Sequence, residues 1–258
     1  MNDLEKYFRQ NDDKLIHKWM HYFDIYDRHF SRFRNKKITI LEIGVSQGGS
    51  LQMWKNYFGP DAMIYGIDID PKCKDLEEEN VEIFIGSQSD RKFLREIIKK
   101  VPKFDILIDD GGHTMKQQKN SYEELFQHVN ENGVYLCEDL HTSYWLEYAG
   151  GHRRKGTFIE YSKKFIDFLN AHHSQQRSLK VNDFTKSVES IHYYDSILVI
   201  EKRKMIPPTH EKSGKLSFQK KSRFPNLASK IKGKSKEIII LNINRILRFF
   251  RLPIIFQN

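Results

Sequence analysis

The sequence has few cysteines and prolines and no long apolar segment. Its 258 residues include two cysteines and seven prolines. Two thiols cannot form a disulfide framework or a cysteine-rich zinc site, so a reducing cytoplasm is the expected compartment. No run approaches the roughly 20 apolar residues of a membrane span. Residues 1–14 contain no apolar signal core, which argues against secretion through a cleaved signal.

The composition is that of a folded protein with an unusual charge distribution. Hydrophobic residues make up 39% of the chain and aromatic residues 13%, which excludes a disordered or collagen-like protein. Residues 202–258 hold 15 of the 43 basic residues and two of the 34 acidic ones. This tail therefore carries a formal charge of +13 and the remaining body −4. Because the body is acidic, we expect no nucleic-acid partner.

Short β-rich apolar segments alternate with helical patterns along the first half of the body. Strands that alternate with helices imply crossover connections and hence a parallel sheet covered on both faces. The strands expected from this pattern are residues 37–45, 62–70, 81–86, 104–110 and 133–139. The helices expected between them are residues 50–58, 71–78, 90–100 and 115–130.

The order of elements changes after residue 140. Residues 157–173 predict a helix, and residues 188–194 and 196–202 flank Asp195–Ser196 as a β-hairpin. The predicted fold class is therefore α/β. We expect a Rossmann-like, seven-stranded mixed sheet of five parallel strands plus an antiparallel C-terminal hairpin, with helices on both faces.

Both ends of the chain differ from this central pattern. Residues 1–36 predict an N-terminal helical lid, with a helix over residues 14–33, and residues 203–258 predict a basic linker followed by an amphipathic tail. Arg245, Arg248 and Arg251 recur every third residue among apolar side chains, as in a helix that lies on an anionic membrane surface. A disordered extension, or a helix packed on the body or on a second copy, explains the same pattern.

A glycine-rich turn follows the first expected strand. Its key positions are Glu42, Gly44, Gly48 and Gly49, and the helix that follows has N-terminal N–H groups that are free to bind a ligand. The glycine spacing differs from the Gly-x-Gly-x-x-Gly of dinucleotide sites, which argues against NAD(P). An ordinary strand-to-helix turn is the alternative.

An acidic residue after the second strand favours a nucleoside ligand. Asp68 follows the glycine turn at the distance expected for an acid that accepts hydrogen bonds from ribose hydroxyls. Asp70 is a nearby competitor, but it is better placed to cap the helix that starts at Pro71. At the end of the third strand, four residues could reach an adenine edge: Ser87, Gln88, Ser89 and Asp90. Ser89 or Asp90 could equally cap the following helix, and capping is the favoured role for Asp90.

Carboxylates and a histidine follow the fourth and fifth strands. Asp109, Asp110 and His113 follow one strand, and Glu138 and Asp139 follow the other. The carboxyl ends of parallel strands line one crevice, so these groups should converge beside the nucleoside. Crowded carboxylates repel one another, and a divalent cation such as Mg²⁺ relieves the repulsion. Helix capping by the acidic pairs is the alternative. A neutral imidazole, such as that of His113, is a suitable general base at pH 7.

The glycine turn, Asp68 and the five-plus-two strand pattern resemble a class I S-adenosylmethionine (SAM)-dependent methyltransferase. The segments LEIGVSQGGS, IYGIDIDP, FDILIDDGGH and CEDLHTSYW are similar to those of the metal-dependent sugar O-methyltransferases of mycinamicin and macrocin biosynthesis, and to the related cephalosporin hydroxylase-like group. The resemblance spans roughly residues 14–201, and the SAM-dependent domain is expected at residues 37–202. Compared with those enzymes, the chain is expected to lack a large N-terminal domain and to add the basic tail.

The resemblance implies a role for each motif residue. His113 would be the catalytic base, and Asp110, Glu138 and Asp139 would bind Mg²⁺. The residues implied in SAM binding are Glu42, Gly44, Gly48, Gly49, Ser50, Asp68, Ser87, Gln88 and Asp109. The acceptor would be a sugar hydroxyl of a glycan, polysaccharide or glycosylated metabolite. His141, Tyr144, Trp145 and Tyr148 could stack on sugar faces or pack as a lid.

Other functions are compatible with parts of the pattern. A metal-dependent enzyme of the cephalosporin hydroxylase-like group would not transfer methyl groups, and a non-catalytic module could recruit a polysaccharide assembly system. A nucleic-acid methyltransferase is disfavoured because no Asn-Pro-Pro-Tyr-like motif follows the fourth strand. We expect a cytoplasmic enzyme, peripheral at the inner face of the membrane if the tail binds lipid, and a homo-oligomer is compatible with the resemblance.

Overall fold

The computed structural model describes residues 1–218, 227–250 and 252. The chain divides into one unit over Met1–Pro208 and a second over Thr209–Asn258. All strands found in the described residues lie in the first unit. The same unit contains the residues predicted to bind the cofactor and those predicted to bind the metal ion or act in catalysis.

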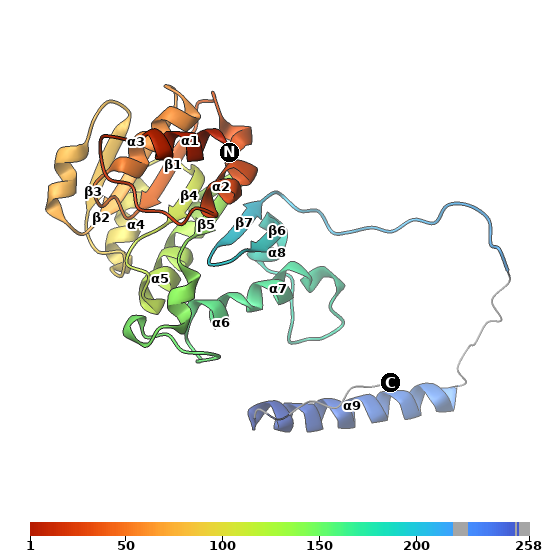
Figure 1. Ribbon diagram of the computed structural model, residues 1–258. Coiled ribbons are helices and arrows are strands. Elements are labelled where there is room, and N and C mark those ends of the chain that lie inside the picture. The colour runs from red at the N-terminus through yellow and green to blue at the C-terminus, as the bar shows by residue number, and fades with distance from the viewer. Residues whose placement is uncertain (219–226, 251, 253–258) are drawn as a thin grey trace. The chain divides into compact units, whose positions relative to one another are not determined.

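One seven-stranded sheet forms the centre of the first unit (Figure 1). Its strands are β1 (Thr39–Ile43), β2 (Met63–Asp68), β3 (Val81–Ile85), β4 (Phe104–Asp109), β5 (Val129–Cys137), β6 (Val188–Tyr193) and β7 (Leu198–Lys202). Their order is β3-β2-β1-β4-β5-β7-β6. The first five strands pair in parallel, and β7 is antiparallel to both β5 and β6. This arrangement confirms the predicted fold class.

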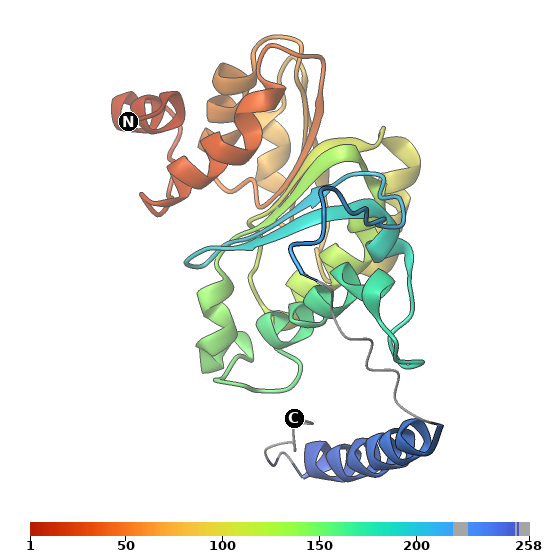
Figure 2. The ribbon, with the colours of Figure 1, turned by 90° about the vertical axis from the view of Figure 1, so that its right-hand side faces the viewer.

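Helices cover both faces of the sheet, so its central strands are buried (Figure 2). One face packs against α1 (Asp3–Gln10), α2 (Tyr22–Phe30) and α3 (Gly49–Phe58). The other packs against α4 (Arg91–Lys100), α5 (Met115–Leu125), α6 (Phe158–Ser162), α7 (Lys164–Leu169) and α8 (Asp183–Ser187). Short 3₁₀ helices are Ser31–Phe33, Pro71–Leu76, Phe126–His128, Leu140–Tyr144, Leu146–Tyr148 and Ala171–His173.

The register of two central strands determines where the acidic motifs meet. β4 and β5 are neighbours, and their last residues, Asp109 and Cys137, pair directly. The chain therefore leaves both strands at the same level of the same edge. Asp110 follows one strand, and Glu138–Asp139 follows the other.

The expected helix over residues 14–33 is only partly correct. The α-helix spans Tyr22–Phe30, whereas residues 11–20, here called the strap, are not helical. Ile16 of the strap is buried in the core, and the carbonyl groups of Lys14 and Leu15 lie directly against Gly49. Tertiary packing thus overrides the helical pattern predicted for residues 14–20. The expected helix over residues 157–173 is likewise broken into α6, α7 and a 3₁₀ turn.

The second unit contains α9 (Leu227–Phe249). Large apolar side chains along its second half are exposed, including Ile239, Ile243 and Ile246. Among the described residues, we find no helix that combines the length and apolar character needed to cross a bilayer. Arg251 and the last residues of the predicted tail helix lie outside the described residues.

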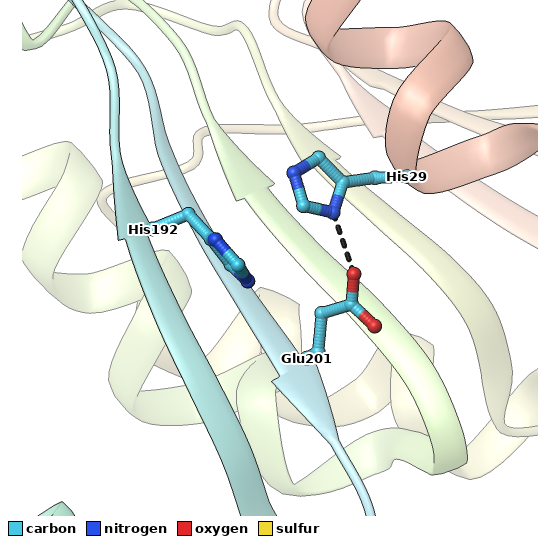
Figure 3. A group of neighbouring side chains, drawn as sticks. All are labelled: His29, His192 and Glu201. Atoms are coloured by element: carbon cyan, nitrogen blue, oxygen red, sulfur yellow. Dashed lines mark hydrogen bonds and ion pairs between the residues drawn. The ribbon is translucent and has the colours of Figure 1, made fainter.

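A buried hydrogen-bonded cluster ties α2 to the C-terminal hairpin (Figure 3). His29 Nδ1 lies 2.5 Å from Glu201 Oε1, and its Nε2 lies 2.9 Å from the Tyr194 hydroxyl. Arg32 donates to the other Glu201 oxygen at 2.6 Å. His192 stacks at an angle on His29, with ring centroids 4.8 Å apart. Both His29 nitrogens have partners and Arg32 already balances Glu201, so this cluster stabilises the fold without needing a metal ion.

The cluster makes folding stability depend on pH. The hydrogen bond with His29, assisted by Arg32, lowers the pKa of Glu201 from 4.5 to about 2. Because the folded-state pKa is depressed, this stabilisation is present above pH 4.5 and is lost as the pH falls toward 2. We expect Glu201→Gln to lower the free energy of unfolding at pH 7 by about 1–2 kcal/mol. Urea unfolding should show the difference from wild type shrinking between about pH 5 and pH 2.

Glu189→Gln is the matched control, because Glu189 makes a more exposed ion pair with Arg203 on the same hairpin. It should change the free energy of unfolding by less than about 0.5 kcal/mol. Equal effects of the two substitutions would contradict a special role for the Glu201 cluster.

Candidate functional site

A cavity of about 400 Å³ opens where β1, β2 and β4 end. The strap, the turn after β1 and the ends of β2 and β3 form one side, and the loop after β4 forms the other. Of the residues implied in cofactor binding, those that line the cavity are Gly44, Ser50, Asp68, Ser87 and Gln88. Asp110, His113 and Asp139 line its opposite end. The structure therefore brings the two predicted groups together in one pocket.

Glu42 lies in the wall beneath the pocket. Its carboxylate is fully buried and accepts hydrogen bonds from Ser50 Oγ at 2.8 Å and Trp54 Nε1 at 3.0 Å. Burial raises the pKa of Glu42 to about 7. The contacts of this carboxylate join the end of β1 to the start of α3, so they fix the turn between these elements.

Asp109 is the last residue of β4 and pairs with Ile43, the residue after Glu42. Gln88 Nε2 donates to one of its oxygens at 2.5 Å, and the Ser121 hydroxyl donates to the other. Burial raises the pKa of Asp109 to about 7. Gln88 Oε1 in turn accepts the Gly112 N–H at 3.0 Å. Asp109 thus holds Gln88 in place at the pocket surface without lining the pocket itself.

Asp68 connects the end of β2 to the glycine turn. Its Oδ2 accepts the backbone N–H groups of Val45 and Ser46, both at 2.9 Å, and its Oδ1 accepts that of Asp70 at 2.9 Å. A carboxylate oxygen has room for a further donor, so Asp68 both shapes the turn and faces the pocket. Ser46 has a φ of 52°, a conformation that is uncommon for a residue other than glycine.

The glycines of the turn permit close approach between chain segments. Gly44 has a φ of 98°, and a Cβ there would overlap the carbonyl oxygen of Asp110. A Cβ on Gly49 would overlap the carbonyl of Lys14 and lie 2.5 Å from that of Leu15. Gly48 has a φ of 76° and faces Leu76. Gly48 and Gly49 therefore allow neighbouring segments to pack against the turn, and of the three glycines only Gly44 lines the pocket.

His113 faces two carboxylates at the far end of the pocket. Its Nε2 lies 3.5 Å from Asp139 Oδ2 and 3.9 Å from Asp110 Oδ1. His113 and Asp139 both have a φ of 55°. Left-handed conformations of such residues are strained, and two of them at one cluster point to a functional site. The buried His113 Nδ1 has no hydrogen-bond partner among the described residues.

Three residues of the N-terminal region complete the acidic cluster. Tyr26 donates to Glu138 Oε1 and Tyr22 donates to Asp139 Oδ1, each at 2.7 Å. Lys18 of the strap contacts both Asp110 and Glu138. None of these three residues is among the site residues predicted from the sequence. The spacing of Tyr22 and Tyr26, four residues apart on one helix face, is the signal that could have indicated a shared role.

Helix capping is not the role of Asp109, Asp110 or Asp139. Thr114 caps α5, so neither Asp109 nor Asp110 does. Asp139 precedes the 3₁₀ helix Leu140–Tyr144, but its side chain makes no capping hydrogen bond. Asp70 and Asp90 do cap the helices that follow them, as expected from the sequence.

A second cavity of about 430 Å³ lies beyond the acidic cluster. Most of its lining is apolar or aromatic and includes Tyr144, Ile159, Ile166 and Tyr193. His141 also lines it and lies 4.0 Å from Asp139, so the two cavities flank the same acidic residue. Trp145 is 45% exposed beside His141 and does not line this cavity.

The sheet of the first unit has the Rossmann-like arrangement of methyltransferases. Residues 41–140 match a family model described as a methyltransferase domain. The chain is 36% identical over 202 residues to demethylmacrocin O-methyltransferase of Streptomyces fradiae, covering 73% of this chain and 51% of that protein. It is 34% identical over 196 residues to mycinamicin VI 2''-O-methyltransferase of Micromonospora griseorubida, covering 71% and 49%.

A solved structure agrees with these sequence matches. The MycE methyltransferase of mycinamicin biosynthesis, in complex with Mg, SAH and mycinamicin VI, aligns with a TM-score of 0.69 and 31% identity. The alignment covers 78% of this chain and 53% of that one. Residues 41–140 thus belong to the methyltransferase domain family, and the chain is a homologue of sugar O-methyltransferases. It spans about half the length of the curated relatives it matches.

The packing of the strap on Gly49 can be tested by one substitution. Gly49→Ala places a methyl group against the carbonyls of Lys14 and Leu15, so the strap must move. We expect faster proteolysis within residues 11–20 and a loss of about 1–3 kcal/mol in the free energy of unfolding. Gln52→Ala, on the same helix, is the control and should leave proteolysis of the strap unchanged. An unchanged cleavage rate in Gly49→Ala would contradict the described packing.

Proposed function

We propose that the chain is a SAM- and Mg²⁺-dependent O-methyltransferase that methylates a sugar hydroxyl of a glycan, polysaccharide or glycosylated metabolite. The observation that carries the proposal is the convergence of the Asp68 pocket and the His113 cluster in one cavity. The homology of the chain to sugar O-methyltransferases supports both the proposed reaction, methyl transfer to oxygen, and the proposed acceptor, a sugar.

The pocket walls fit the parts of SAM. Asp68, already fixed by the backbone of the turn, would hold the ribose hydroxyls through its remaining acceptor capacity. Ser87 and Gln88 would lie along the adenine, and the backbone at Gly44, which lines the cavity, would lie along the methionine part. Bound SAM supplies the electrophilic methyl group of its sulfonium.

The acidic cluster fits a divalent cation. Asp110, His113 and Asp139 each offer a ligand atom within 4.8 Å of the others, and Glu138 lies on the same strand end. Carboxylate oxygens are the donors that Mg²⁺ prefers. Asp110, Glu138 and Asp139 would hold the ion, which when bound lowers the pKa of a coordinated sugar hydroxyl.

His113 would remove the proton from the acceptor hydroxyl. Its Nε2 lies 3.5 Å from Asp139 Oδ2 and 3.9 Å from Asp110 Oδ1, where such a hydroxyl would lie. Asp139 would stabilise the imidazolium that forms. Much of the remaining rate enhancement would come from positioning, because the rigid strand ends hold both reactants in one cavity.

The second cavity would bind the part of the acceptor beyond the methylated sugar. Tyr144 and Tyr193 offer aromatic faces, and His141 links this cavity to Asp139. Aromatic rings contact the apolar faces of sugars as well as apolar aglycones. This supports the prediction that the loop containing Tyr144 contributes to acceptor binding.

Substitution of the proposed base should separate catalysis from cofactor binding. His113→Ala should lower the methyl-transfer rate by about 100-fold or more, because proton removal is lost. SAM affinity, measured by calorimetry, should stay within about twofold, because His113 lies at the acceptor end. His173→Ala alters an exposed histidine and serves as the control. Wild-type turnover by His113→Ala, followed as S-adenosylhomocysteine formation, would exclude His113 as the base.

We also propose that the C-terminal tail binds an anionic membrane surface, which would place the enzyme at the inner face of the membrane. Ile239, Ile243, Ile246 and Phe250 follow one another at spacings of four, three and four residues, so they share one face of the helix, and they are exposed. Arg245 and Arg248 lie on another face. An exposed apolar face beside a basic one is typical of interfacial helices.

Vesicle flotation tests the role of the tail. The full chain should float with anionic phospholipid vesicles and not with neutral ones, and Ile243→Glu with Ile246→Glu should abolish flotation by removing apolar contact. Lys212→Glu with Lys215→Glu, which leaves α9 intact, should weaken flotation only in part. If the Ile243/Ile246 variant floats as well as the wild type, the tail does not anchor the protein through this face.

A further inference from the structure

Lys18 places a positive charge inside the acidic cluster. The side chain of Lys18 is only 3% exposed. Its Nζ lies 3.0 and 2.9 Å from the two oxygens of Glu138 and also contacts Asp110 Oδ2. These contacts join residues that are 92 and 120 positions apart in the sequence, so Lys18 is held by the tertiary fold alone.

The contacts of Glu138 leave little room for a second cation. Tyr26 donates to Oε1, and Lys18 donates to both Oε1 and Oε2. An ion that bound Glu138 and Asp110 together would have to occupy the place of the ammonium group. Two cations at the same carboxylates also repel each other strongly in a buried site.

The strap that carries Lys18 also covers the cofactor cavity. Leu15, Ile16 and His17 line that cavity, and the neighbouring Lys14 and Leu15 carbonyls rest on Gly49. Lys18 is thus the link between the acidic cluster and the segment that closes the pocket. A change at the carboxylates that expels Lys18 would also move the strap.

We propose that Lys18 is an internal cation that competes with the divalent ion for Asp110 and Glu138, so that ion binding releases the strap from the cluster. The proposal rests on the metal site of the proposed function. Ion binding and packing of the strap are then reciprocally coupled. An interaction that stabilises the packed strap lowers the affinity of the site for the ion, and bound ion destabilises the packed strap. Lys18 is accordingly a positioning residue that sets metal affinity.

Binding of Mn²⁺ alone to the full chain, followed by the EPR signal of the free ion, tests the competition. Lys18→Met removes the ammonium group while keeping a chain of similar length, and should bind Mn²⁺ about tenfold more tightly than the wild type. Lys14→Met removes the same charge from the same strap without touching the carboxylates, and should change the affinity by less than about twofold. Lys18→Arg retains the charge and should not gain affinity.

Hydrogen exchange of the strap gives a second, independent readout that does not require a variant. Amides of residues 11–20 in the wild-type protein should exchange faster when Mn²⁺ is added, whereas those of α4 should not change. In a folded Lys18→Met protein, exchange of the strap should be fast with or without the ion. Slower exchange on adding Mn²⁺ to the wild type would show that the ion and Lys18 bind together, which overturns the proposal.

The outcomes distinguish this proposal from the proposed function. Mn²⁺ affinities that are equal in wild type and Lys18→Met, or weaker in the variant, overturn the competition while leaving the metal site and methyl transfer intact. Binding to neither protein overturns the competition together with the metal part of the proposed function. In that case, an assay of methyl transfer without added metal shows whether the protein is a methyltransferase that does not need the ion.

Discussion

The structure depends on compensating the negative charge of three carboxylates that lie together at the ends of β4 and β5. β4 and β5 are adjacent and in register at their last residues, so Asp110, Glu138 and Asp139 leave one edge at one level. Ionised carboxylates at this separation repel one another unless donors or cations lie between them. Tyr22, Tyr26 and Lys18 supply these partners, all from residues before β1. The N-terminal region is therefore part of the site as well as its cover.

The sequence predicted the sheet and the meeting of the motifs because both follow from local patterns. Apolar segments alternating with helical ones specify a parallel sheet, and the carboxyl ends of its strands share an edge. That reasoning placed Asp68, Asp110, His113 and Asp139 in one crevice, as the structure has them. It also assigned Asp70 and Asp90 correctly as caps.

The same reasoning failed where long-range packing decides the structure. Residues 14–20 of the strap were expected to be helical with the segment that becomes α2, but close contact with Gly49 holds them in another conformation. Lys18 has no local signal, since its partners are distant in the sequence. The glycine turn was read as an approach to a ligand, whereas two of its glycines make room for neighbouring chain segments. Contacts of this kind are visible only in three dimensions.

We propose that the carboxylates of Asp110, Glu138 and Asp139, beside the Asp68 pocket, form a divalent cation site. Anomalous diffraction from crystals of the full chain grown with Mn²⁺ and S-adenosylhomocysteine tests this claim most directly. We expect an anomalous peak about 2.0–2.2 Å from oxygens of Asp110, Glu138 and Asp139, with His113 beside it. A nucleoside in the pocket with no peak at these carboxylates, or a peak only at the His29–His192–Glu201 cluster, would contradict it.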